Sequence, residues 1–317
     1  MYRIKRVNET FLVTVAAAVV GSFIVGIIAG MVGGDELIML LISQLTFFAP
    51  TAFYLWENKF NLKETIRLKP VKVSTVCMLV GFMYSIMPAA TFVNAVSLKF
   101  TTNTIDTTIT GIAEKYPLII GVLVVAVMPS ILEESVYRGV FFNEYRKLHP
   151  GKAVVLSGLL FGLAHMNFNQ FVYAFLLGMV FAVVVEVTDS IVSSMVLHFV
   201  MNGTSMISVY AQVMAEEAGM TVLETEQNTQ EVIDTYIQNG WIPAIAGLVI
   251  GYLILKIIAQ NEGREGSLKT LFIKEKQGDY REVLENGQTG GGKMATLALW
   301  MGMVICLGIM LLVEVTA

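Results

Sequence analysis

The 317-residue chain is too apolar and too weakly charged to be a soluble domain. Hydrophobic residues make up 55% of it, charged residues only 15%, and its mean hydropathy is +0.68, whereas soluble domains carry about 25% charged residues. This composition indicates an integral membrane protein in a lipid bilayer. With a net charge of −4 and no basic stripe or nucleic-acid motif, the chain is not expected to bind nucleic acid.

Apolar segments along the chain predict an all-α, polytopic transmembrane helix bundle of eight or nine spans. A helix needs about 20 residues to cross about 30 Å of hydrocarbon, and backbone polar groups inside lipid must all be paired, which favours helices over strands. The segments begin near residues 10, 36, 74, 117, 153, 171, 190, 241 and 294. Only Asn167, Asn169 and Gln170 separate 153–170 from 171–187, so this pair forms a tight hairpin or one broken element.

Lysine and arginine indicate how these segments are oriented, because cytoplasmic loops carry an excess of both. Basic residues precede the first segment, follow the second and fourth, and lie between the last two, whereas loop 213–240 has six acidic residues and no Lys or Arg. We therefore expect a cytoplasmic N-terminus and an outside C-terminus, in the plasma membrane. The first apolar run, about 11–32, exceeds the 7–15 residues of a cleavable signal and is retained as a span.

The predicted organisation has four parts. Residues 1–114 hold the first three helices. Residues 115–212 hold helices 4–7, which form the core that is expected to carry the functional site. An acidic outside loop follows at 213–240. Residues 241–317 hold the last two helices, joined by the charged inside linker 260–293.

Smaller sequence features predict packing rather than chemistry. Asn228 and Glu231 have the spacing of a capping box at the start of a short amphipathic helix. Glycines at four-residue spacing predict close helix packing; these sets are Gly26/Gly30/Gly34, Gly158/Gly162 and Gly247/Gly251. We expect two further pairs to have no chemical role: Cys77 and Cys306 as small core residues without a disulfide, and Glu186 and Asp189 as ordinary loop carboxylates.

Three short blocks place polar side chains inside apolar segments of the core. They are Glu133-Glu134-x-x-x-Arg138, Phe161-x-x-x-His165 and His198-x-x-x-Asn202. An ionisable group at membrane depth costs at least ~2.5–3.5 kcal/mol, so it is a candidate functional residue by default. At 1.5 Å per residue, the catalytic candidates lie about 12–18 Å from the inner ends of their helices; they are Glu133, His165, His198 and Asn202. Their common depth predicts a single site.

Helical spacing separates the roles of the two neighbouring carboxylates. Residues four apart share a helix face, so Glu134 is expected to pair with Arg138, while Glu133 faces a cavity. The same spacing joins two further pairs, which are Phe161 with His165 and His198 with Asn202. Phe161, Glu134 and Arg138 are therefore supporting residues of the predicted site.

These residue types suit an amide hydrolase that activates water. A carboxylate and a neutral imidazole that face one water can remove its proton without forming a covalent intermediate, the roles expected of Glu133 and His165. A second imidazole and an amide can donate hydrogen bonds to the developing oxyanion, the roles expected of His198 and Asn202. Loss of one such donor typically lowers the rate by about 10²–10³.

The order and spacing of the three blocks resemble the CPBP family (CAAX protease and bacteriocin-processing, or Abi) of intramembrane glutamic endopeptidases, and are similar to those of type II CAAX prenyl endopeptidases. The resemblance covers about residues 115–205, and all three motifs match. It implies the same water-activating and oxyanion-binding roles for these residues. It also implies a peptide or a lipidated protein tail as substrate.

Other readings of the same residues remain open. Glu133, His165 and His198 can supply the His₂Glu ligand set of a catalytic zinc ion. No His-Glu-x-x-His motif is present and an amide is a poor zinc ligand, so we favour a mechanism without a cofactor. The same fold can also serve as a non-catalytic membrane scaffold or immunity protein. A transporter with a proton relay would show inverted repeats, which the sequence lacks.

Overall fold

A computed structural model describes residues 3–101, 106–220, 230–272, 282–283, 289–290 and 294–316. The helices in chain order are α1 (Arg3–Val32), α2 (Glu36–Glu57), α3 (Leu62–Thr65), α4 (Val73–Leu98), α5 (Asp106–Lys115), α6 (Leu118–Gly121), the π-helix η1 (Val122–Val127), α7 (Met128–Glu134), the π-helix η2 (Ser135–Phe142), α8 (Asn143–Tyr145), α9 (Pro150–Ala164), α10 (Phe168–Thr188), α11 (Ile191–Glu217), α12 (Gln230–Asn239), α13 (Trp241–Asn261), α14 (Ser267–Thr270) and α15 (Leu297–Thr316). The strands β1 (Glu282–Val283) and β2 (Thr289–Gly290) pair antiparallel.

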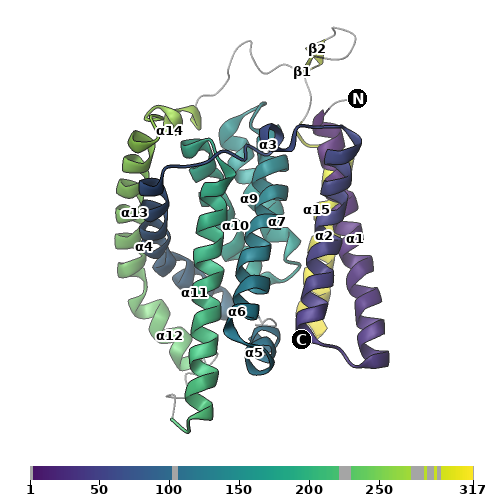
Figure 1. The fold of residues 1–317 in the computed structure, drawn as a ribbon, viewed down its shortest axis with the longest axis vertical. Helices are drawn as coiled ribbons and strands as arrows, with labels where there is room; N and C mark the ends of the chain where they lie inside the picture. Colours follow the sequence, from purple (N-terminus) through teal and green to yellow (C-terminus); the bar gives the residue numbers. More distant parts are fainter. Residues whose placement is uncertain are drawn as a thin grey trace.

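The long helices run side by side along one axis (Figure 1). Among the described residues, eight helical stretches are long and apolar enough to cross a membrane: α1, α2, α4, the continuous run Leu118–Tyr145, α10, α11, α13 and α15. The prediction of an all-α, membrane-spanning bundle with eight or nine spans is therefore confirmed. The chain is an integral membrane protein.

The two ends of the bundle differ in the way that the charge pattern predicts. The first turn of α1 lies at the same end as α3 and α14, whereas α5, α12 and the C-terminus lie at the other end (Figure 1). The described parts of the basic loops that we assign to the cytoplasm thus lie at the same end of the bundle. Which end faces the cytoplasm stays a prediction.

The paired segments 153–170 and 171–187 form a hairpin of α9 and α10. The 15 residues of α9 rise only about 22 Å, less than the hydrocarbon thickness of about 30 Å. We therefore expect the turn between the two helices, which carries His165, to lie at membrane depth. Asn167 caps α10 by accepting a hydrogen bond from the Gln170 backbone N–H at 3.0 Å, so this turn keeps a backbone donor paired inside the bundle.

Glycine spacing correctly predicts close helix packing at two of three places. A Cβ at Gly158 or Gly162 would lie 2.8 Å from a backbone carbonyl oxygen of α10, and one at Gly247 would lie 2.0 Å from a carbonyl oxygen of α4. The prediction is wrong for Gly26 and Gly30, where nothing lies within 4 Å of the added Cβ. No helix of the described part of the chain packs on that side of α1, so these two glycines face outward.

Other local predictions have mixed outcomes. The short helix expected within the acidic loop exists as α12, although Asn228 of its proposed capping box lies outside the described residues. Helix α11 continues to Glu217, so the loop begins later than residue 213. Both cysteines are free; Cys306 is buried as expected, but the expectation for Cys77 is wrong because this side chain is exposed on α4. Half of linker 260–293 lies outside the described residues.

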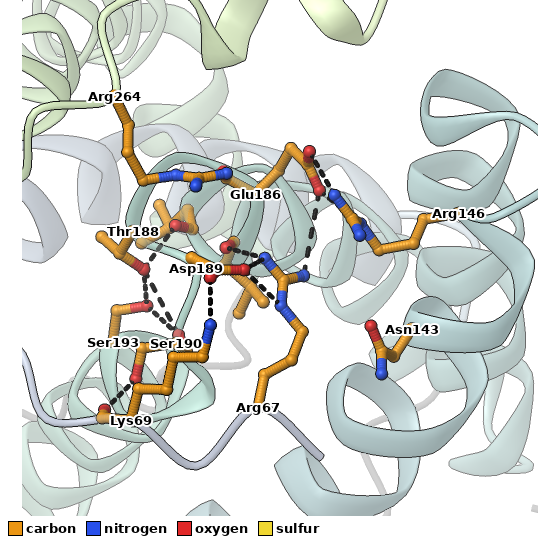
Figure 2. Close-up of polar contacts among 12 residues, drawn as sticks. Arg67, Lys69, Asn143, Arg146, Glu186, Thr188, Asp189, Ser190, Ser193 and Arg264 are labelled. Atoms are coloured by element: carbon orange, nitrogen blue, oxygen red, sulfur yellow. Dashed lines mark hydrogen bonds and ion pairs between the residues drawn. The ribbon is translucent and has the colours of Figure 1, made fainter. Parts of the chain in front are cut away.

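Figure 2 shows an ion network at the end of the bundle that holds α3 and α14. We call it the basic clasp; its members are Arg67, Lys69, Arg146, Glu186, Asp189 and Arg264. Arg67 is only 5% exposed and donates from Nε to Asp189 Oδ1 at 2.8 Å. Arg146 donates twice to the Glu186 carboxylate, both times at 2.6 Å. The carboxylates of Glu186 and Asp189 are therefore not ordinary loop groups, because they tie three separate segments together, and Arg264 adds a fourth through the Glu186 backbone carbonyl.

The clasp predicts that acid weakens the fold through Asp189. Burial raises the pKa of Asp189, but the Lys69 hydrogen bond and the Arg67 charge outweigh burial and hold this pKa below its ordinary value. A carboxyl with a lowered folded-state pKa stabilises the fold above its unfolded pKa of about 3.9, and this contribution is lost as the pH falls through the folded-state value. Thermal unfolding in detergent should show this loss below about pH 4.

The matched variant for this measurement is Asp189→Asn. Asp189 has a left-handed backbone, with φ 57°, which asparagine also tolerates. The variant should be less stable than the wild type at pH 7, and the difference should shrink as the pH falls below about 4. A stability difference that is independent of pH would contradict the assigned role of the Asp189 charge.

Candidate active site

The carboxylates Glu133 and Glu134 end helix α7, between two π-helical stretches. Helix η1 precedes α7 and η2 follows it, within one continuous helical run. Hydrogen bonds of the π type are rare and often occur at functional sites. The sequence pattern of this run gives no sign of them.

Glu134 binds two partners through one oxygen. Its Oε1 accepts from Arg138 Nη1 at 2.9 Å and lies 2.9 Å from His198 Nδ1. The Glu134 and Arg138 side chains are fully buried, and His198 is nearly so. The predicted Glu134–Arg138 pair is confirmed. The contact with His198, which comes from α11, adds a partner that the sequence does not reveal.

Aromatic rings enclose the Arg138 guanidinium. It lies 4.3 Å from the ring centroid of Phe161 and 5.2 Å from that of Phe181. A cation over an aromatic face gains about 2 kcal/mol or more when both groups are desolvated. Phe161 thus supports the charged pair as well as the histidines, since its ring also lies 5.9 Å from the His198 ring.

Glu133 points toward two other side chains. Its Oε1 accepts a hydrogen bond from Gln44 Nε2 at 2.9 Å, and its Oε2 lies 4.0 Å from His198 Nε2. The Glu133 side chain is 15% exposed. Both neighbouring carboxylates therefore adjoin His198, one at each ring nitrogen.

His165 is held at the C-terminal end of α9. Its Nδ1 lies 2.8 Å from the Phe161 carbonyl oxygen, which can only accept, so Nδ1 carries the proton and Nε2 keeps a lone pair. The Phe161 ring stands perpendicular to the imidazole at 5.0 Å, as the sequence predicts. Within the described residues no hydrogen bond or ion pair joins His165 to Glu133, although the two lie within electrostatic range.

Asn202 lies one turn after His198 on α11. Its Nδ2 donates to the Val125 carbonyl oxygen of η1 at 3.0 Å. An amide nitrogen carries two hydrogens, so one remains for a second acceptor. The structure thus brings residues from α7, the α9–α10 turn and α11 to one region.

Residues 115–204 match the family model described as type II CAAX prenyl endopeptidase Rce1-like. Residues 115–204, which we call the Rce1-like core, are therefore similar to this family. The match confirms the resemblance that the three motifs predict and supports a membrane protease. It covers less than a third of the chain but includes all the predicted site residues. Neither a curated protein nor a solved structure matches the chain significantly.

Sequence reasoning missed Gln44, which lies outside the Rce1-like core. This residue belongs to α2, 89 positions before the carboxylate to which it donates. The available signal is a long amide side chain within the apolar run Leu40–Leu45. A polar side chain at membrane depth needs a partner there, but the sequence does not identify which one.

The zinc alternative requires three ligands that converge on one point. Among the residues that the structure describes, no group of three His, Cys, Asp or Glu side chains is placed to hold a metal ion. The ligand set Glu133, His165 and His198 stays a prediction for the Rce1-like core. Metal analysis of the purified protein tests it directly.

Proposed function

We propose that this protein is an intramembrane endopeptidase of the glutamate type that cleaves a peptide bond near the cytoplasmic side of the plasma membrane. One observation carries the proposal: Glu133 and His198, from two different spans, face each other at 4.0 Å inside the bundle. Such groups are costly at membrane depth, so their presence there indicates a function. The Rce1-like match supports a protease rather than another use of these groups.

The proposed reaction starts with a water beside Glu133. Glu133 takes a proton from the water, assisted by the lone pair on His165 Nε2, and the water oxygen bonds to the substrate carbonyl carbon. The carbonyl oxygen becomes an oxyanion, which accepts hydrogen bonds from His198 Nε2 and the second amide hydrogen of Asn202. The C–N bond then breaks, and Glu133 returns its proton to the leaving amine.

Glu134 has a defined part in this proposal. It accepts from His198 Nδ1, so His198 can donate to the oxyanion only when both ring nitrogens carry a proton. In that form His198 is a cation flanked by two carboxylates, which orient its ring from either side. Arg138 balances the charge of Glu134 in turn.

The substrate we propose is a peptide or a lipidated protein tail that reaches the site from the cytoplasmic side. Comparing the peptidomes of cells that carry the wild type and His165→Ala tests this. Loss of a side chain that assists the proton transfer lowers the rate by about 10²–10⁴, so at least one cleaved product should disappear from the His165→Ala cells. Identical peptidomes in cells that make both proteins to the same level would contradict a protease.

A further inference from the structure

Helix α2 packs against α7 and η2, although it lies outside the Rce1-like core. Gln44 donates to Glu133 Oε1 at 2.9 Å. One turn later the Phe47 ring stacks on Tyr137, with centroids 5.7 Å apart and planes 24° apart. The residues contacted, Glu133 and Tyr137, are also one turn apart, so two neighbouring contacts fix the register of the two helices.

The Gln44 hydrogen bond makes the two oxygens of Glu133 unequal. Oε1 is occupied by the amide, while Oε2 faces His198 Nε2 at 4.0 Å. A general base must present its oxygen to the proton in a defined direction. Without the amide donor, the carboxylate can rotate about its last bond, and its free oxygen no longer has a fixed direction.

The type of donor also matters. A lysine or arginine at position 44 would place a third charge beside Glu133 and Glu134, whereas an amide donates without one. The other amide atom, Gln44 Oε1, is buried and has no hydrogen-bond partner in the described part of the protein. The amide nitrogen points toward the Glu133 carboxylate because the carboxylate would repel the amide oxygen.

We propose that Gln44 is the positioning residue that holds the catalytic carboxylate of Glu133. This inference rests on the proposed protease function. It extends the site to α2 and gives the N-terminal helices a part in the reaction. Gln44 acts through Glu133 and does not itself exchange a proton.

Three variants of α2 test this role. Gln44→Met keeps the length of the side chain and removes the donor. Gln44→Glu keeps the shape but can donate only when its carboxyl is protonated. Ser43→Ala is the control, because Ser43 is exposed and its hydroxyl donates to the Leu40 carbonyl of its own helix. The probe is a quenched fluorescent peptide that spans the cleavage site lost in His165→Ala cells.

Loss of a group that orients a catalytic residue typically lowers activity by about 10- to 100-fold. We expect this loss in kcat for Gln44→Met, with KM unchanged and with Ser43→Ala equal to the wild type. For Gln44→Glu, the ratio of its rate to the wild-type rate should rise as the pH falls, because protonation restores the donor. A purely structural role would not produce this pH-dependent recovery.

Two results would overturn the positioning role while leaving the protease function intact. One is a wild-type kcat in Gln44→Met, and the other is a Gln44→Glu profile parallel to the wild-type profile. If the wild-type protein itself cleaves no peptide, the proposed function fails, and the role of Gln44 fails with it.

Discussion

Glu133→Gln is expected to abolish hydrolysis while leaving the protein folded. The amide has nearly the same size as the carboxylate and can still accept the hydrogen bond from Gln44, but it cannot take a proton from water. Removing the general base should lower kcat by about 10²–10⁴, to the background of the assay. Turnover of the quenched peptide in liposomes and thermal unfolding in detergent measure the two effects separately.

The matched control for this substitution is Glu9→Gln. Glu9 lies on α1, is 40% exposed and pairs with Lys5 at 3.7 Å, so the same chemical change occurs far from the site. Its activity should equal that of the wild type. Full activity in Glu133→Gln would remove Glu133 from the reaction. If cells that carry the inactive variant kept the wild-type phenotype, the hypothesis of a non-catalytic scaffold would be favoured over that of a protease.

The parts of the site that the sequence predicts are those set by one helix. Glu134 and Arg138 are four residues apart, as are Phe161 and His165, and a single helical turn brings each pair together whatever surrounds it. The spans are predictable for a similar reason, because length and hydropathy are local properties of a segment.

The contacts between helices could not be read in the same way. His198 meets Glu134 across 64 residues, through the packing of α11 against α7. The backbone on both sides of α7 is π-helical, and no residue pattern in the sequence predicts this. The glycines show the same limit, because Gly158 and Gly26 have identical spacing to a second glycine, yet only Gly158 meets another helix.

Breaking the Glu134–Arg138 pair should produce the largest loss of stability. Both side chains are fully buried and their atoms lie 2.9 Å apart. Removing one member of a buried ion pair costs about 3–5 kcal/mol, because the other charge stays in the interior without compensation. Arg138→Met should therefore lower the unfolding temperature strongly. Glu134→Leu should do the same, since the guanidinium would keep only its aromatic neighbours.

The double variant separates stability from catalysis. Replacing both charges by apolar groups of similar volume is often neutral for folding, so Glu134→Leu/Arg138→Met should be more stable than either single variant. It should nevertheless be inactive, because His198 has lost the acceptor of its Nδ1 hydrogen. Unfolding temperatures of the four proteins and their turnover rates measure both quantities. Recovered activity in the double variant would show that His198 does not depend on Glu134 for its orientation.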